Sequence, residues 1–178
     1  MYSRATRSAA EVEHEAALDE EHWSYMDGFA AGMIARGPTL AADRTTWTGS
    51  VHILDLPSAA AAREFAEREP YNRAGLFEQH VIRRFRNLLG RTMWESPAPT
   101  DDPRFLVIAQ ALPDLPALER ERLIVLGELL TPDEARPAGV VLAVQAPSRD
   151  AVGAFLGRGH AGPDEHVEIH DWELGGRR

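Results

Sequence analysis

The sequence predicts an α+β protein made of two copies of one small folding unit, and three observations support this prediction. The chain has 178 residues, 44% of them hydrophobic and 26% charged, as in folded domains. A shift of 90 positions aligns residues 37–65 with residues 127–155 without a gap. Strand and helix patterns alternate in both copies. A repeat of this length is too long for a solenoid and fits a duplicated domain.

The aligned segments share glycine, proline and serine residues, which are typical of turns. The matches pair Gly37 with Gly127, Leu40 with Leu130, Gly49 with Gly139, Pro57 with Pro147, Ser58 with Ser148, and Phe65 with Phe155. Further on, LLGR at 88–91 resembles LGGR at 174–177. Chance similarity in an alanine-rich chain is the alternative, but composition alone does not align turn residues. We expect a first repeat over residues 1–95, a linker over 96–103 and a degenerate second repeat over 104–178.

In the first repeat we expect a long helix from Glu11 to about Arg36, because acidic residues crowd its first turns. Its buried stripe comprises Leu18, His22, Tyr25, Met26, Phe29 and Met33, and Gly37–Pro38 ends it. A strand over 49–56, a helix with Ser58 as N-cap and a strand over 79–85 follow. Residues 1–7 are short and hardly apolar, so we expect either an edge strand there or a chain that starts late.

The second repeat predicts the same plan with a shorter first helix. We expect strands over 104–110, 139–145 and 166–173, and a helix over 148–157. Two such halves can pack sheet against sheet, so that one chain forms an intramolecular pseudo-dimer. Whether whole chains pair further as a homodimer stays open.

Composition removes several kinds of chemistry. The chain has no cysteine, which excludes disulfides, thiol nucleophiles and cysteine-bound metals. It also has no lysine, so it cannot form a Schiff base. A net charge of −9 argues against nucleic acid as a partner. The apolar stretches are too short for a membrane span and the N-terminus lacks a signal sequence, so we expect a cytoplasmic protein. We expect a small-molecule ligand, no cofactor and no metal.

The first repeat resembles the YCII-related (YciI-like) family from His22 to about Arg91. The resemblance rests on His22, Gly37–Pro38, Gly49–Ser50, Glu69–Pro70–Tyr71 and Ala74–Gly75. The second repeat resembles the family only in its skeleton, which points to a tandem form. The resemblance implies two ferredoxin-like β-α-β-β-α-β repeats packed as a pseudo-dimeric α/β barrel.

The family is credited with a His–Asp pair in a pocket, and it includes a dehydrochlorinase of chlorinated hydroxyhydroquinones. Here Glu69 stands at the aspartate position, which keeps the carboxylate and adds one methylene group. The resemblance therefore implies acid–base chemistry on a small oxygenated organic molecule, with an aromatic one as an option. The alternative is a non-catalytic small-molecule-binding or interaction module that retains a relic pocket, so the sequence leaves open whether the protein is an enzyme.

His22 and Glu69 are the candidate catalytic residues. His22 lies on an apolar helix stripe, so it is either a general acid/base oriented by Glu69 or a core histidine with one hydrogen bond. Glu69 could equally be a solvated turn residue. The candidate substrate-binding residues are Ser50 and His52, which share one strand face, and Tyr71, which could instead be a packed aromatic. Their second-repeat counterparts are apolar: Val140 replaces Ser50 and Leu142 replaces His52. We expect one site per chain, on the first repeat; inert copies on both sides are the alternative.

Overall fold

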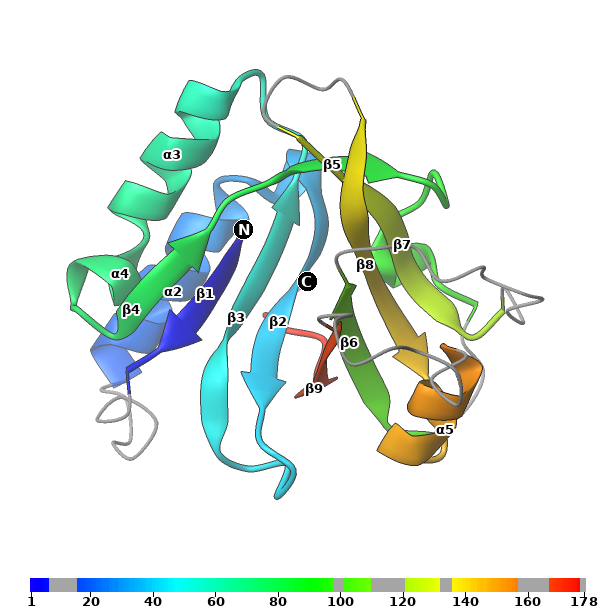
Figure 1. Ribbon diagram of the computed structural model, residues 1–178. Helices are drawn as coiled ribbons and strands as arrows, with labels where there is room; N and C mark the ends of the chain where they lie inside the picture. The colour runs from blue at the N-terminus through cyan, green and yellow to red at the C-terminus, as the bar shows by residue number, and fades with distance from the viewer. Residues whose placement is uncertain (7–15, 98–100, 110–120, 132–135, 157–166, 177–178) are drawn as a thin grey trace. The chain divides into compact units, whose positions relative to one another are not determined.

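The computed structural model describes the whole chain except residues 7–15, 98–100, 110–120, 132–135, 157–166 and 177–178 (Figure 1). The chain divides into two compact units. Unit 1 contains residues 1–82 together with 173–178, and unit 2 contains residues 83–172. Both units combine antiparallel strands with helices, which confirms the predicted α+β class.

Unit 1 has a sheet with helices on one face (Figure 1). Its strand order is β4 (Phe77–Val81), β1 (Tyr2–Ala5), β3 (Trp47–Leu54), β2 (Met33–Leu40), and neighbours are antiparallel. The helices are α2 (Ala16–Asp27), α3 (Ala59–Arg68) and α4 (Pro70–Arg73), with a 3-10 turn η1 (Ala30–Gly32) before β2. Beside β2, the N–H of Glu173 donates to Pro38 O at 3.2 Å and that of Gly175 to Arg36 O at 3.0 Å.

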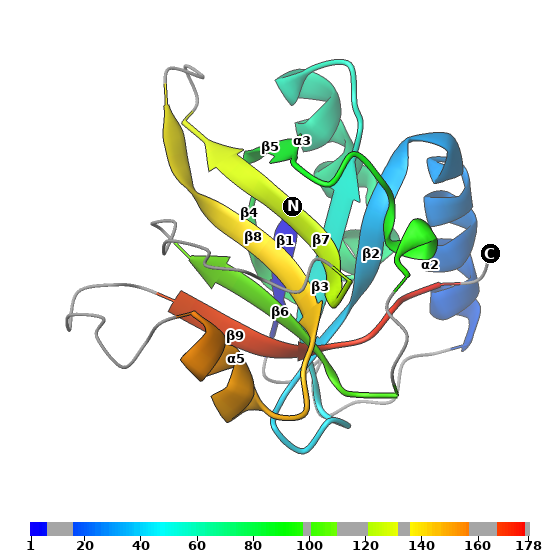
Figure 2. The same ribbon diagram turned by 90° about the vertical axis from the view of Figure 1, so that its right-hand side faces the viewer.

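Unit 2 repeats this arrangement with five strands, and α5 (Arg149–Phe155) lies against its sheet (Figure 2). The strand order is β9 (Val167–Trp172), β6 (Arg104–Ala109), β8 (Pro137–Gln145), β7 (Leu123–Leu130), β5 (Arg84–Asn87). A 3-10 turn η2 (Met93–Glu95) follows β5. The fully or nearly fully buried core includes Val107, Leu123, Val140, Leu142 and Val152.

The 90-residue offset holds residue by residue in the sheets. Met33 pairs with Leu54 on the β2–β3 ladder, and Leu123 pairs with Val144 on the β7–β8 ladder. The register shifts at the same two places on both ladders. Ser58 and Ser148 each accept a hydrogen bond at 3.1 Å, from Ala61 N and Ala151 N. The predicted N-cap at Ser58 is therefore confirmed, and its counterpart caps α5 in the same way.

The closing segments of the two sequence copies are exchanged between the units. Residues 88–91 resemble 174–177, but unit 2 includes residues 83–91 and unit 1 includes residues 173–178. In each unit the exchanged segment lies against an equivalent glycine. A Cβ atom on Gly127 would lie 2.1 Å from the Phe85 ring, and one on Gly175 would lie 2.6 Å from Gly37 Cα.

The long first helix was predicted wrongly. Within the described residues α2 ends at Asp27, and β2 occupies positions assigned to the helix and to its end. Met33 fits the helical spacing of the buried stripe, but it is also the first residue of a strand in which Met33 and Ala35 are buried. A single residue cannot distinguish the helical period of about 3.6 from the strand period of about 2. Gly37 and Pro38 lie inside β2, where the fixed φ of proline fits the extended backbone.

Three further strand predictions need correction. β1 is not an edge strand, because it pairs with β3 on one side and β4 on the other. Although the strand is short, its residues Ser3 and Ala5 are buried. The predicted strand over 79–85 is two strands, β4 and β5. β7 was not foreseen, and the shorter helix of the second repeat would fall on residues 110–120, outside the described residues.

Gly49 is required by the close approach of β1 to β3. Its φ is +155°, and a Cβ atom there would lie 2.2 Å from the backbone oxygen of Ser3. A side chain at this position would push apart the two strands that carry Ser3, Ser50 and His52.

Candidate active site

The structure brings the two candidate catalytic residues into direct contact. His22 Nδ1 lies 2.6 Å from Glu69 Oε1. The His22 side chain is 12% exposed and that of Glu69 is fully buried. An ionised carboxylate only accepts hydrogen bonds, so Nδ1 of His22 is the donor in this pair. In the neutral imidazole this leaves the lone pair on Nε2, which is the atom that can take a proton from another group.

Glu69 is held in place by the helix it caps. It is the N-cap residue of α4, and its second oxygen, Oε2, accepts a hydrogen bond from the backbone N–H of Asn72 at 2.7 Å. Pro70 follows at the first position of the helix, which suits proline. One carboxylate therefore serves the helix terminus and the imidazole with different oxygens. The structure places Glu69 as a buried partner of His22 and not as a solvated turn residue.

Tyr71 joins the pair through its ring. Its ring stacks on the His22 imidazole with centroids 4.1 Å apart and planes inclined by 8°. Its hydroxyl donates a hydrogen bond to Asp19 Oδ1 at 2.7 Å. Burial, together with this bond to Asp19, raises the pKa of Tyr71, so the phenol stays protonated. The hydroxyl proton that was expected to serve a ligand is engaged within the protein, and Tyr71 offers its ring to the site.

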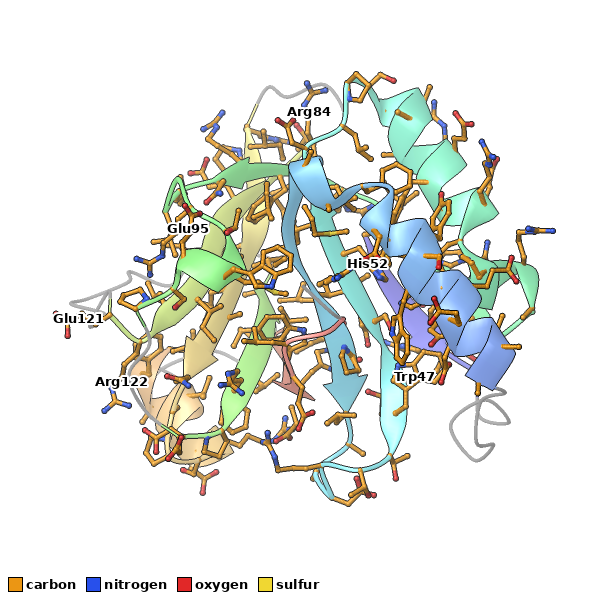
Figure 3. All side chains as sticks on the ribbon, turned by 180° about the vertical axis from the view of Figure 1, so that it is seen from behind. Trp47, His52, Arg84, Glu95, Glu121 and Arg122 are labelled. Carbon is orange, nitrogen blue, oxygen red and sulfur yellow. The ribbon has the colours of Figure 1, made fainter. Side chains whose placement is uncertain are left out.

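His52 and Ser50 lie on β3 with both side chains buried, His52 only 2% and Ser50 6% exposed. Figure 3 shows His52 between β3 and the helix α2. Its ring lies edge-on to that of His22, with centroids 5.9 Å apart. The Nδ1 atom of His52 is buried and has no hydrogen-bond partner among the residues that the structure describes. Burial, followed by the positive charges of His22, the amino terminus and Arg36, holds the pKa of His52 well below its ordinary value, so the ring is neutral.

A second polar chain supports the turn that carries Glu69. The side-chain N–H of Asn72 donates to Ala66 O at 3.0 Å, which leaves Asn72 Oδ1 facing His80 Nε2 at 2.6 Å. Nε2 of His80 is therefore the donor, and Nδ1 accepts from the Ser3 hydroxyl at 2.9 Å. Burial lowers the pKa of His80, which agrees with a neutral ring in this chain.

Sequence reasoning missed four of these residues. Asp19 could have been found, since it precedes His22 by three positions on the same helix and so shares its face. Ser3, Asn72 and His80 had no local signal, because Ser3 and His80 meet across 77 positions of sequence.

Unit 2 lacks the polar set wherever it is described. The strand pairing places Val140 at the position of Ser50 and Leu142 at that of His52, and both are fully buried. The same pairing places Ala109 at the position of Ser3 and Val167 at that of His80. The second-repeat positions that correspond to His22 and Glu69 fall near Leu112 and Gly159, which lie outside the described residues. The corresponding sheet face of unit 2 is a hydrophobic core.

Among the residues that the structure describes, no three His, Asp or Glu side chains gather in a way that could hold a metal ion. Among the same residues no helix has the length and apolar character needed to cross a membrane.

Unit 1 is thus a small α+β domain with a buried histidine–carboxylate pair under its helices. The family model of the YCII-related domain matches residues 1–86, which confirms the resemblance seen in the first repeat. This part of the chain is a YCII-related domain.

The chain is also similar to the solved structure of a 5-chloro-2-hydroxyhydroquinone dehydrochlorinase from Burkholderia phenoliruptrix in complex with 2,5-dihydroxybenzoquinone. The two share 26% identity with a TM-score of 0.44, over 51% of this chain and 94% of that one. Among curated proteins, no relative matches the chain.

Proposed function

We propose that the YCII-related domain performs acid–base chemistry on a small oxygenated organic molecule, without a cofactor. The observation that carries this proposal is the 2.6 Å contact between His22 Nδ1 and the buried carboxylate of Glu69. A carboxylate on Nδ1 fixes the tautomer and stabilises the imidazolium that forms when Nε2 takes a proton. His22 transfers the proton, Glu69 orients the His22 ring, and Ser50 and His52 contact the oxygen atoms of the ligand.

The environment of His22 supports this role. The imidazole is mostly buried and stacks on Tyr71, so its orientation is restrained on its face as well as at Nδ1. Positioned general acids and bases of this kind contribute about 10² to 10⁴ in rate. One site per chain is part of the proposal, because unit 2 has valine and leucine where unit 1 has Ser50 and His52.

The alternative is a non-catalytic binding module, and the N-cap role of Glu69 favours it. Since Oε2 caps α4, the carboxylate has a structural reason to be present without any reaction. In this reading His22 satisfies the other oxygen of a buried charge, and the site binds a ligand that it does not change.

The experiment that separates the two is a thermal-shift screen of small hydroxy and oxo compounds, followed by mass spectrometry of the compounds that stabilise the protein. We expect at least one compound to be converted, and His22→Gln to slow conversion by about 10² to 10⁴. The matched control is His170→Gln, since His170 Nε2 forms another histidine–glutamate pair with Glu168 at 3.1 Å in unit 2. Binding without conversion would support the module, and conversion that survives His22→Gln would contradict the proposed role of His22.

A further inference from the structure

We propose that His52 is a specificity-determining residue whose Nδ1–H binds the oxyanion formed when His22 takes the proton of an acidic hydroxyl group, a phenol or an enol. This inference rests on the proposed function and extends it to the class of substrate. It starts from a feature that the histidine–glutamate pair does not use, the unpartnered Nδ1 of a buried ring.

An imidazole as deeply buried as His52 normally has its polar atoms paired. It is only 2% exposed, yet none of the described residues forms a hydrogen bond with its Nδ1. Leaving a buried donor or acceptor unsatisfied costs about 1–3 kcal/mol, and few native groups are left so. Unit 2 avoids the cost by placing Leu142 at the equivalent position. A bound oxygen atom would satisfy the nitrogen in unit 1.

The surroundings of His52 favour a neutral ring. Burial above all, and the nearby positive charge of Arg36, keep the ring from being protonated. A neutral imidazole with its proton on Nδ1 can donate a hydrogen bond to an oxygen that becomes negative. It does so without transferring its own proton to that oxygen. Once His22 has taken the proton, its positive charge and that of Arg36 stabilise negative charge on an oxygen beside His52.

The geometry allows one oxygen to meet both rings. The ring centroids of His22 and His52 are 5.9 Å apart. An oxygen bonded to a nitrogen of each ring at about 2.8 Å spans nitrogen atoms up to about 5.6 Å apart. In the step itself the O–H bond of the substrate breaks and its electron pair stays on oxygen. The proton forms an N–H bond at His22 Nε2, and the imidazolium is paired with the Glu69 carboxylate.

The charges of the site select a hydroxyl group over a carboxylate. A ligand bound at His22 Nε2 would lie near the buried Glu69 carboxylate, which would repel an anion. A phenol or enol enters neutral, and its charge arises only as His22 becomes positive. The more acidic the hydroxyl group, the more completely its proton is transferred.

The test uses 4-nitrophenol and 4-nitroanisole, which differ only in that a methyl group replaces the proton. The phenolate has its own visible absorption band, so binding with proton transfer is seen directly at a pH low enough to keep free 4-nitrophenol neutral. We expect wild type to bind 4-nitrophenol with growth of the phenolate band and to bind 4-nitroanisole without it. His52→Leu should weaken 4-nitrophenol binding about 10- to 100-fold, as loss of a charge-assisted hydrogen bond does, and leave 4-nitroanisole unchanged. His52→Gln keeps an N–H donor and should recover part of the loss.

Far-UV circular dichroism and thermal unfolding of each variant show whether it is folded, and His170→Gln serves as the control. If His22→Gln abolishes the phenolate band but His52→Leu leaves 4-nitrophenol affinity unchanged, the inference about His52 is overturned and the proposed function stands. If wild type converts a compound from the screen but does not bind 4-nitrophenol, the substrate class is overturned alone. If His22→Gln leaves both the band and conversion intact, the proposed function fails.

Discussion

Glu69 holds His22 with one carboxylate oxygen and the first turn of α4 with the other. The two contacts are 2.6 Å to His22 Nδ1 and 2.7 Å to the backbone N–H of Asn72. The imidazole is therefore positioned by a helix terminus and not by a flexible surface side chain, since Glu69 is fully buried.

Replacing Glu69 tests this division of the carboxylate. In Glu69→Gln the uncharged amide no longer requires Nδ1 of His22 to be the protonated nitrogen, so we expect a mixture of tautomers. ¹⁵N chemical shifts of the His22 ring report this directly. The hydrogen bond between His22 and the Glu69 carboxylate loses its charge, and such bonds are worth about 1.5–3 kcal/mol. The free energy of unfolding should therefore fall by about that amount. Glu168→Gln is the matched control, because it alters the pair with His170. An unchanged His22 tautomer in Glu69→Gln would contradict the prediction.

His52→Leu should stabilise the protein while it impairs the site. The substitution removes an unpartnered buried nitrogen and introduces the residue that unit 2 uses at the equivalent position. We expect the free energy of unfolding to rise by about 1 kcal/mol, the low end of the cost of an unsatisfied buried group. Urea unfolding at neutral pH measures this change. A loss of more than about 1 kcal/mol would mean that the imidazole packs better than its missing hydrogen bond implies.

Stability should fall as the pH drops below the ordinary histidine pKa of 6.5. The pKa of His52 is well below that value in the folded protein, so between the two values the unfolded chain binds more protons than the folded one. The free energy of unfolding then rises with pH through this window, by up to about 1.4 kcal/mol per pH unit for one group. His80 acts in the same direction. Urea unfolding at several pH values should give a shallower slope for His52→Leu, and equal slopes would show that His52 does not titrate on unfolding.

Gly49→Ala should destabilise unit 1 strongly. The new Cβ would lie 2.2 Å from Ser3 O at a φ of +155°, so β1 has to shift. We expect a loss of at least about 2 kcal/mol from strain and overpacking. The control is Gly153→Ala, where a Cβ meets nothing within 4 Å in the middle of α5 and should gain up to about 1 kcal/mol from helix propensity. Similar effects at both glycines, measured by thermal unfolding, would refute the close approach.

The two main parts of the prediction had different sources. The duplication was predicted because turn residues such as Gly49 and Ser58 have counterparts 90 positions later, and the strand pairing has the same offset. The pairing of His22 with Glu69 came from the family resemblance, since the two residues are 47 positions apart and nothing local joins them.

The rest was hidden for physical reasons. The residues of β2 were predicted as helix because Met33 continues a helical spacing of apolar residues, although Met33 is buried as part of a strand. The chain from Ser3 through His80 to Asn72 depends on tertiary pairing of β1 with β4, which a single sequence does not reveal. The orphan nitrogen of His52 is a property of packing, which no residue pattern encodes.

The exchanged closing segments make synthesis order matter. Unit 1 includes residues 173–176, which lie beside β2, so this edge of its sheet stays uncovered until those residues have been synthesised. A fragment ending in the predicted linker would expose the backbone of β2 and carry a β5 strand whose partner, β7, has not been made. The two predicted repeats therefore do not coincide with the two units, because each unit includes a few residues from the other repeat.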